Sequence, residues 1–238
     1  MKAVVFGATG GIGAALTWRL AQRADIDEVF ACSRSGEGPA GAAITPLSVD
    51  VLSEESLAEA ATRIKEAGGA ALVIVAIGLL SDGDALQPEK TYRHQTLPAF
   101  EQVFAINTFA PGLIAKHMLP LMPRRGRAVF AALSARVGSI SDNRLGGWHA
   151  YRASKAALNM LIRNYAIEQA RRSDDFIAVS LHPGTVDTGL SKPFQGNVPE
   201  KKLFTPDQSA GYLLSVIDGL TPTDTGKAFD WAGEPIPA

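Results

Sequence analysis

The chain has little of several features that would narrow its class at once. Its 238 residues include a single cysteine, Cys32, so no disulfide can form within the chain, and it opens on a strand-like run instead of a signal peptide. A formal net charge of -1 gives no basic excess for nucleic acid or an anionic membrane. The longest apolar run, from Ala70 to Leu80, is much shorter than the roughly 20 residues that span a bilayer. These absences predict a cytoplasmic protein that binds neither polyanions nor membranes.

What is present is a regular alternation of apolar runs and helical patterns. With 46% hydrophobic residues, the chain can form one well-packed domain over residues 1–238. The alternation is typical of βα units and predicts an α/β fold, a doubly wound parallel sheet in three layers (α/β/α). We expect strands at 3–6, 28–32, 44–49, 71–77, 129–133, 177–181 and, at a sheet edge, 227–231. Helices are expected at 12–23, from a Ser53 cap to about 68, at 99–118, at 149–172 and at 205–218, and a mobile loop at 184–203.

A glycine-rich turn, GATGGIG, lies between the first strand and the first helix. Its glycines, Gly7, Gly10, Gly11 and Gly13, allow tight turning and close approach of a pyrophosphate to a helix N-terminus. A flexible turn is the alternative, but the strand before it and the helix and strand after it favour a dinucleotide site. No Gly-Lys-Ser/Thr follows, which argues against a P-loop.

The end of the second predicted strand bears on which dinucleotide is bound. An acid there accepts the ribose hydroxyl of NAD, whereas this chain has Ser33 and Arg34, which suit a 2′-phosphate. We therefore expect NADP(H) rather than NAD(H), the alternative being a solvated surface arginine. Asp50, at the end of the third strand, can accept a hydrogen bond from adenine or act as a turn residue.

Tyr151 and Lys155 are four residues apart on a predicted helix, and so lie on one face. A tyrosine exchanges protons poorly near neutrality, and a neighbouring ammonium favours the phenolate. The pair can therefore act in general acid/base chemistry. Alone it is weak evidence, because the spacing occurs by chance.

Taken together, five motifs resemble the classical short-chain dehydrogenase/reductase (SDR) family, a family of the Rossmann fold. They are GATGGIG, Asn107 in FAINTFAPG, Ser134 in LSARVGS, YRASKAALN and HPGTVDTGL, in that order. SARVGSISDN with YRASKAALN looks closest to the branch of sniffer-type carbonyl reductases and C-factor-like proteins.

The resemblance implies a catalytic tetrad. Tyr151 would be the general acid/base, Lys155 would lower its pKa and bind the nicotinamide ribose, Ser134 would orient the carbonyl, and Asn107 would interrupt its helix to hold a water. The implied cofactor contacts, joined with those inferred from the residues, are Gly7, Thr9, Gly10, Gly11, Ile12, Gly13, Ser33, Arg34, Asp50, Val51, Ala76, Gly78, Asn107, Tyr151, Lys155, Pro183, Gly184, Val186 and Thr188.

The chain departs from the family pattern in places. Ala135 follows Ser134 where many relatives have a second serine, and Ser134 is farther from Tyr151 than usual, so Ser139 is an alternative. Phe6 replaces a threonine, and Ala76 replaces the asparagine of Asn-Ala-Gly. Five further residues are candidates for contacts to the substrate, and each has an ordinary loop or packing role as the alternative. They are Asn143, Trp148, Phe194, Leu203 and Phe204.

The expected function is NADP(H)-dependent interconversion of a carbonyl and an alcohol on a small molecule. No metal site is expected, because the four histidines lack the spacing of a zinc site. A cofactor-binding signalling or sensor protein is the alternative from another class, and an epimerase or dehydratase of the extended group ranks third. The resemblance also implies a homodimer or homotetramer formed through the helices at 99–118 and 149–172.

Overall fold

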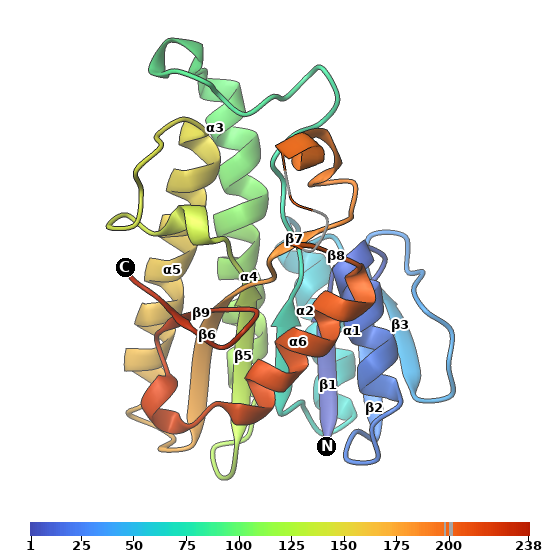
Figure 1. Ribbon diagram of the computed structural model, residues 1–238. Coiled ribbons are helices and arrows are strands. Elements are labelled where there is room, and N and C mark those ends of the chain that lie inside the picture. Colours follow the sequence, from blue (N-terminus) through green and yellow to red (C-terminus); the bar gives the residue numbers. More distant parts are fainter. Residues whose placement is uncertain (198, 200–201) are drawn as a thin grey trace.

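The strands form a sheet in the doubly wound order. The computed structural model describes residues 1–197, 199 and 202–238, and its main sheet has the order β10-β9-β6-β5-β4-β1-β2-β3 (Figure 1). All neighbours are parallel except β9 and β10. The strands are β1 Lys2–Phe6, β2 Glu28–Ser33, β3 Ile44–Ser48, β4 Leu72–Val75, β5 Ala128–Leu133, β6 Phe176–His182, β9 Ala228–Asp230 and β10 Pro235–Ile236.

One strand prediction is corrected. The strand expected at 227–231 exists as β9, but it is not at the edge, because the chain turns back and adds β10 antiparallel to it. The sheet is therefore mostly, not wholly, parallel.

The helices cover both faces of the sheet, which confirms the three layers. They are α1 Gly11–Ala21, α2 Glu54–Glu66, α3 Leu97–Phe104, α4 Ala110–Met118, α5 His149–Gln169 and α6 Pro206–Gly219. Side chains of α2, α4 and α5 pack into one core cluster with the sheet, and those of α1 and α6 pack into another on the opposite face (Figure 1). No helix among the described residues is long and apolar enough to cross a membrane.

Local hydrogen-bond chemistry sets several helix ends. The Ser53 side chain accepts from the Ser56 amide at the start of α2, and Thr205 and Gln208 form a reciprocal capping box at the start of α6. The helix expected at 99–118 begins earlier, at Leu97, and is interrupted by a π-helical segment, Ala105–Phe109. The helix expected at 149–172 ends at Gln169.

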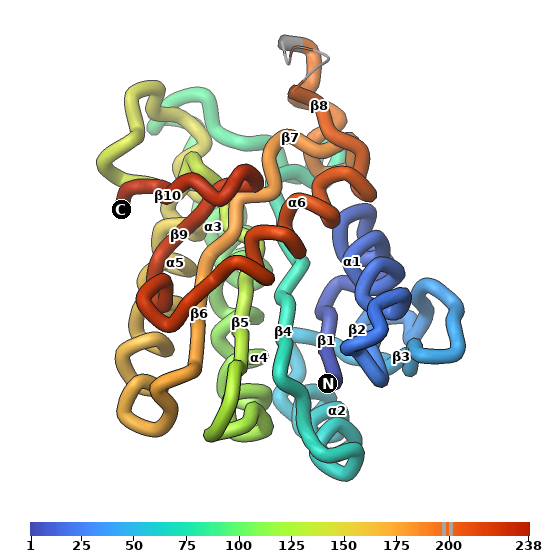
Figure 2. Tube along the Cα trace, turned by 60° about the horizontal axis from the view of Figure 1, so that its bottom comes forward, coloured from blue at the N-terminus to red at the C-terminus, as the bar shows by residue number. Residues whose placement is uncertain are grey.

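The segments that follow β4, β5 and β6 lie at the same end of the sheet in both views (Figures 1 and 2). After β6 come a two-stranded sheet, β7 Thr185–Val186 with β8 Leu203–Phe204, and a 3-10 helix, Lys192–Asn197. The mobile loop expected at 184–203 includes residues 198, 200 and 201, which lie outside the described residues. The parallel strands thus bring the predicted site residues together at their carboxyl ends.

Candidate active site

The glycine-rich turn lies where the sheet order changes direction. From β1 the chain continues to β2 on one side, and β4 pairs with β1 on the other, which is the position where doubly wound sheets bind ligands. α1 begins at Gly11 after an N-cap, Gly10, that has no side chain to cap it, and its first turn contains no acid. The amides at this helix N-terminus are therefore available to an anion such as a pyrophosphate.

The glycines of this turn are needed for different reasons. A Cβ atom on Gly13 would lie 2.1 Å from the carbonyl oxygen of Gly7, and one on Gly7 would lie 2.6 Å from that of Ala76. On Gly11 it would lie 2.9 Å from Cγ2 of Thr188. Gly10 is exposed and its nearest atom would be 3.4 Å away. Packing of the chain itself explains Gly7 and Gly13, whereas Gly10 has no such requirement and fits close approach of a ligand.

The three residues expected to select the nucleotide differ in availability. Ser33 is buried and its hydroxyl donates to the carbonyl oxygen of Glu37 at 2.6 Å. Asp50 is exposed, and its carboxylate accepts from the amide of Leu52 at 2.9 Å, as a turn residue does. Arg34 is exposed and forms no ion pair with any described residue. Of the three, Arg34 has the side chain that is free to meet a phosphate.

Tyr151 and Lys155 are both buried on the first turns of α5. Lys155 is 2% exposed, its ammonium donates to the carbonyl oxygen of Leu133 at 2.8 Å, and Nζ lies 5.9 Å from the Tyr151 ring centre. The Tyr151 hydroxyl forms no hydrogen bond with any of the described residues. Burial raises the pKa of Tyr151 to about 12 and lowers the pKa of Lys155 to about 7.

This pair therefore holds a protonated phenol near neutral pH. The expectation that Lys155 lowers the pKa of Tyr151 is not visible in this arrangement, because burial acts most strongly on both groups. That role stays a prediction.

Asn107 connects the π-helical segment to α5. Its Oδ1 accepts from the Leu79 amide and its Nδ2 donates to the Leu79 carbonyl oxygen, each at 2.8 Å. Nδ2 also donates to Ser154 Oγ at 3.1 Å. A Cβ atom on Gly78 would lie 3.7 Å from both Asn107 Oδ1 and Lys155 Nζ, so these three residues lie close together. The helix is interrupted at Asn107, as the resemblance implied.

The serine expected to orient the carbonyl is otherwise engaged. Ser134 is buried and its hydroxyl donates to Oδ1 of Asn159 at 2.8 Å. The next residue, Ala135, packs into the apolar cluster that contains Tyr151. Ser139 is 2% exposed and its Oγ accepts from the Asp142 amide at 3.2 Å, which leaves its own proton unassigned. Both serines therefore remain candidates for the residue that orients the carbonyl.

Aromatic side chains line the neighbourhood of Tyr151. The Trp148 ring centre lies 6.2 Å from that of Tyr151 and 5.1 Å from that of Phe194, and all three belong to one cluster. Phe204 instead packs against Tyr212 and Trp231, so it attaches β8 to the C-terminal part of the fold. Asn143 is exposed and its side chain accepts from the Gly146 amide, while Leu203 lies in β8.

The segment after β6 lies between the glycine-rich turn and the apolar cluster that contains Tyr151. The Pro183 carbonyl oxygen accepts from Ser209 Oγ at 2.8 Å, which ties the segment to α6, and Val186 is buried. A Cβ atom on Gly11 would meet Thr188, and one on Gly78 would meet Leu190 at 3.5 Å. The segment after β6 therefore lies beside both the glycine-rich turn and Gly78.

Known proteins resemble the chain along nearly its whole length. The family profile described as "short chain dehydrogenase" matches residues 1–198. The chain belongs to the short-chain dehydrogenase family. It is 33% identical over 228 residues to 1-hydroxy-2-glutathionyl-2-methyl-3-butene dehydrogenase of Rhodococcus sp. (strain AD45), covering 94% of this chain and 93% of that protein. It is 38% identical over 136 residues to C-signal of Myxococcus xanthus, covering 57% and 76% of the two chains.

Solved structures agree on the fold of this short-chain dehydrogenase. NADPH-bound carbonyl reductase from chicken fatty liver has a TM-score of 0.84 at 26% identity, covering all of this chain and 94% of that one. Carbonyl reductase Sniffer of D. melanogaster also has a TM-score of 0.84, at 20% identity, covering all of this chain and 99% of that one. The Rossmann-type fold of the family is confirmed, and members of this family generally use a nicotinamide cofactor.

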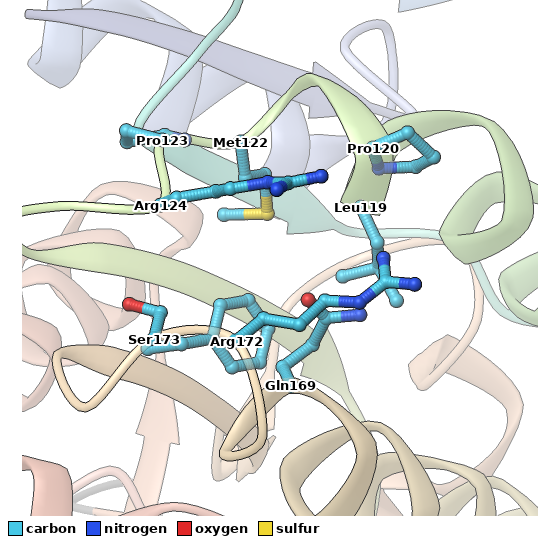
Figure 3. A pocket seen from close by; sticks show the side chains of 9 residues that line it. Leu119, Pro120, Met122, Pro123, Arg124, Gln169, Arg172 and Ser173 are labelled. Carbon is cyan, nitrogen blue, oxygen red and sulfur yellow. The ribbon is translucent and has the colours of Figure 1, made fainter.

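A cavity of about 70 Å³ (Figure 3) lies near the amino ends of β5 and β6, at the other end of these strands from the predicted site residues. It lies between the segment before β5 and the end of α5, and Arg124, Arg172 and Ser173 are among its lining residues. None of the predicted site residues lines it. Within the described ranges, no group of three or more His, Cys, Asp or Glu side chains is placed to hold a metal, and Cys32 is buried.

Two residues at the site were missed by the sequence reasoning. Asn159 follows Lys155 by four residues, so the helical spacing that joined Tyr151 to Lys155 would also have placed it beside them. Glu89, whose carboxylate faces the start of α5, is 61 residues away from its partner, and no local pattern connects the two.

Proposed function

We propose that this short-chain dehydrogenase is an NADP(H)-dependent oxidoreductase that interconverts a carbonyl and an alcohol. The observation that carries the proposal is the buried Tyr151, whose hydroxyl is unpaired among the described residues one turn before a buried ammonium on the same helix. A bound nicotinamide would supply hydride to the carbonyl carbon.

The chain's own residues would manage the proton. Burial holds the pKa of Tyr151 at about 12, so its hydroxyl is protonated at neutral pH and can donate to the developing alkoxide oxygen during reduction. Lys155 makes one hydrogen bond to the described residues, although an ammonium has three donors. Its remaining donors suit the hydroxyls of a ribose. Asn107 would interrupt its helix so that a backbone carbonyl holds a water between Lys155 and solvent, through which the donated proton is replaced.

The features at the nucleotide end support NADP(H) as the cofactor. The uncapped start of α1 suits the pyrophosphate, and Arg34 is exposed and unpaired among the described residues, as a 2′-phosphate partner must be. A protein with the same fold at 26% identity is described as NADPH-bound. The remaining predicted cofactor contacts, from Thr9 to Thr188, belong to this proposal.

Steady-state oxidation of NADPH, with NADH in parallel, tests the proposal across aldehydes, ketones and quinones. We expect turnover with NADPH that falls by roughly 10²- to 10⁴-fold in Tyr151→Phe, with NADPH affinity retained. Tight NADPH binding without turnover of any carbonyl, unchanged by Tyr151→Phe, would contradict the enzyme and favour a sensor.

That second candidate, a cofactor-binding signalling or sensor protein, is favoured by one specific observation. Ala135, which has no hydroxyl, lies in the cluster with Tyr151, while Ser134 is bonded to Asn159. Single and double alanine variants of Ser134 and Ser139 address it. If the reductase is correct, at least one serine variant loses kcat while retaining NADPH affinity.

We also propose a homodimer formed through the α4 and α5 side of the molecule. Three large apolar side chains there are exposed, Phe109 by 58%, Met160 by 61% and Ile167 by 47%. Light scattering after size exclusion should give twice the mass of the chain, and Met160→Glu should give the monomer. A wild-type monomer would contradict this.

A further inference from the structure

Glu89 is a buried charge that none of the motifs explains. It is 4% exposed, and Lys155 is the other buried charged side chain among the described residues. Glu89 forms no ion pair with residues in the described ranges. Burying a carboxylate without compensation is costly, so its surroundings must stabilise it.

The compensation comes from the N-terminus of α5. The two carboxylate oxygens of Glu89 lie 3.4 and 3.3 Å from the Ala150 amide nitrogen, and the Glu89 carbonyl oxygen accepts from the Trp148 amide at 2.6 Å. Both contacts go to amides that the start of a helix leaves unsatisfied, at the positive end of a 21-residue helix. Glu89 therefore does what an N-cap side chain does, from 61 residues earlier in the chain.

The cap comes from a distance because the N-cap position has another use. Trp148 occupies it with φ 51° and ψ 46° and makes no capping bond with its side chain. It is the non-glycine residue with positive φ among the described residues, and such a conformation is costly for a bulky side chain. The conformation places the indole against the rings of Tyr151 and Phe194. A serine or aspartate at 148 would remove the indole from its contacts with these rings.

We propose that Glu89 is a positioning residue, which fixes the first turn of α5 and thereby holds Tyr151 and the Trp148 indole in place for a carbonyl substrate. The inference rests on the proposed reductase function. Tyr151 follows the capped Ala150 directly, so loss of the cap shifts the phenol and the indole together. It leaves the glycine-rich turn untouched, because that turn belongs to β1 and α1.

Three variants at this position, with a matched control, test the proposal. Glu89→Ala removes the acceptor, Glu89→Asp withdraws it by one methylene, and Glu89→Gln keeps an oxygen at the same reach. The control, Ser53→Ala, removes the cap of α2, which lies outside the catalytic cluster. It should lower the denaturation midpoint without changing the kinetics.

We expect Glu89→Ala to lower kcat/KM for the carbonyl by roughly 10- to 100-fold, with KM for NADPH unchanged. Glu89→Asp should lose activity similarly while remaining folded, and Glu89→Gln should recover most of it. If Glu89→Ala does not fold, Glu89→Asp decides the matter. Wild-type kcat/KM in a folded Glu89→Asp variant, or a loss no greater than that of Ser53→Ala, overturns the proposal.

Amide hydrogen exchange keeps this result separate from the fate of the proposed function. Glu89→Ala or Glu89→Asp should speed exchange in residues 148–152 while the amides of α1 keep their protection. If the wild type reduces none of the carbonyls, the reductase proposal fails, and unchanged exchange at 148–152 then overturns the role of Glu89 as well. Faster exchange with unchanged kcat/KM makes Glu89 a structural cap only and also overturns the proposal.

Discussion

The glycine-rich turn, from Gly7 to Gly13, and the cluster around Tyr151 are built in contrasting ways. The turn is a stretch of consecutive residues whose shape depends on glycine packing, and it leads into the uncapped N-terminus of α1. The cluster is made of buried groups from distant segments, in which Asn107, Leu133 and Glu89 each contact α5. One depends on the absence of side chains and the other on their exact partners in space.

The contrast teaches which kind of substitution each region can tolerate. In the turn, a methyl group added at Gly7 or Gly13 meets backbone atoms that cannot move aside. In the cluster, a lost hydrogen bond leaves a buried group without a partner.

The glycines of the turn should separate into packing and binding positions. Gly13→Ala places a carbon 2.1 Å from the Gly7 carbonyl oxygen, so we expect the free energy of unfolding to fall by about 3 kcal/mol or more. Gly10→Ala meets its nearest atom at 3.4 Å and should keep its stability while losing NADPH affinity. Urea unfolding and NADPH titration measure the two. Equal stability losses would show that the glycines are not distinct.

Lys155 should make stability depend on pH in an unusual direction. Its pKa is lowered from 10.5 to about 7, so between these values the unfolded state binds more protons than the folded state. Stability therefore rises with pH, and we expect a gain of roughly 1–3 kcal/mol from pH 7 to pH 9 without cofactor. Lys155→Met should be more stable at pH 7 and lack the gain. Chemical denaturation at each pH decides, and parallel curves for the two proteins would count against a buried ammonium.

Arg34 should affect the cofactor but not the catalytic cluster. Arg34→Ala should raise KM for NADPH by roughly 10- to 100-fold, the value of a charged hydrogen bond, while leaving KM for NADH and for the carbonyl unchanged. Arg124→Ala, at the cavity near the amino ends of β5 and β6, is the matched control. An equal effect on both cofactors would exclude a 2′-phosphate contact.

Phe194 should affect the substrate alone. Phe194→Ala removes the ring that packs against Trp148, so kcat/KM for an aromatic ketone should fall by about 2- to 10-fold. A small aliphatic aldehyde, which cannot reach that ring, serves as the control substrate. A fall of similar size for both substrates, or a change in NADPH affinity, would show that Phe194 does not contact the substrate.

The same contrast explains what the sequence could predict. The capping residues Ser53 and Thr205 were predicted because their partners lie three residues away, and the mostly parallel, doubly wound sheet followed from alternating βα units. The π-helical segment at Asn107 has no signature in hydrophobic periodicity, and the family resemblance implied only that the helix is interrupted there. β10 was missed because a two-residue strand is too short to show a pattern.

Side-chain partners across long distances were beyond reach in the candidate site. The sequence identified Tyr151 and Lys155, but it could not show that burial outweighs their mutual effect on pKa. Nor could it show that Ser134 donates to Asn159, or that Glu89 caps α5. These facts depend on how the segments pack, which no local spacing encodes.

Both outer strands of the main sheet contain a proline, Pro46 in β3 and Pro235 in β10. A proline has no amide hydrogen to offer, so an incoming strand from another chain would find an interrupted ladder at either side. The sheet is thereby protected against growth into a continuous β-structure shared between molecules. Replacing either proline with a residue that has an amide hydrogen would complete the ladder on that side and leave an edge that can pair with a strand of another chain.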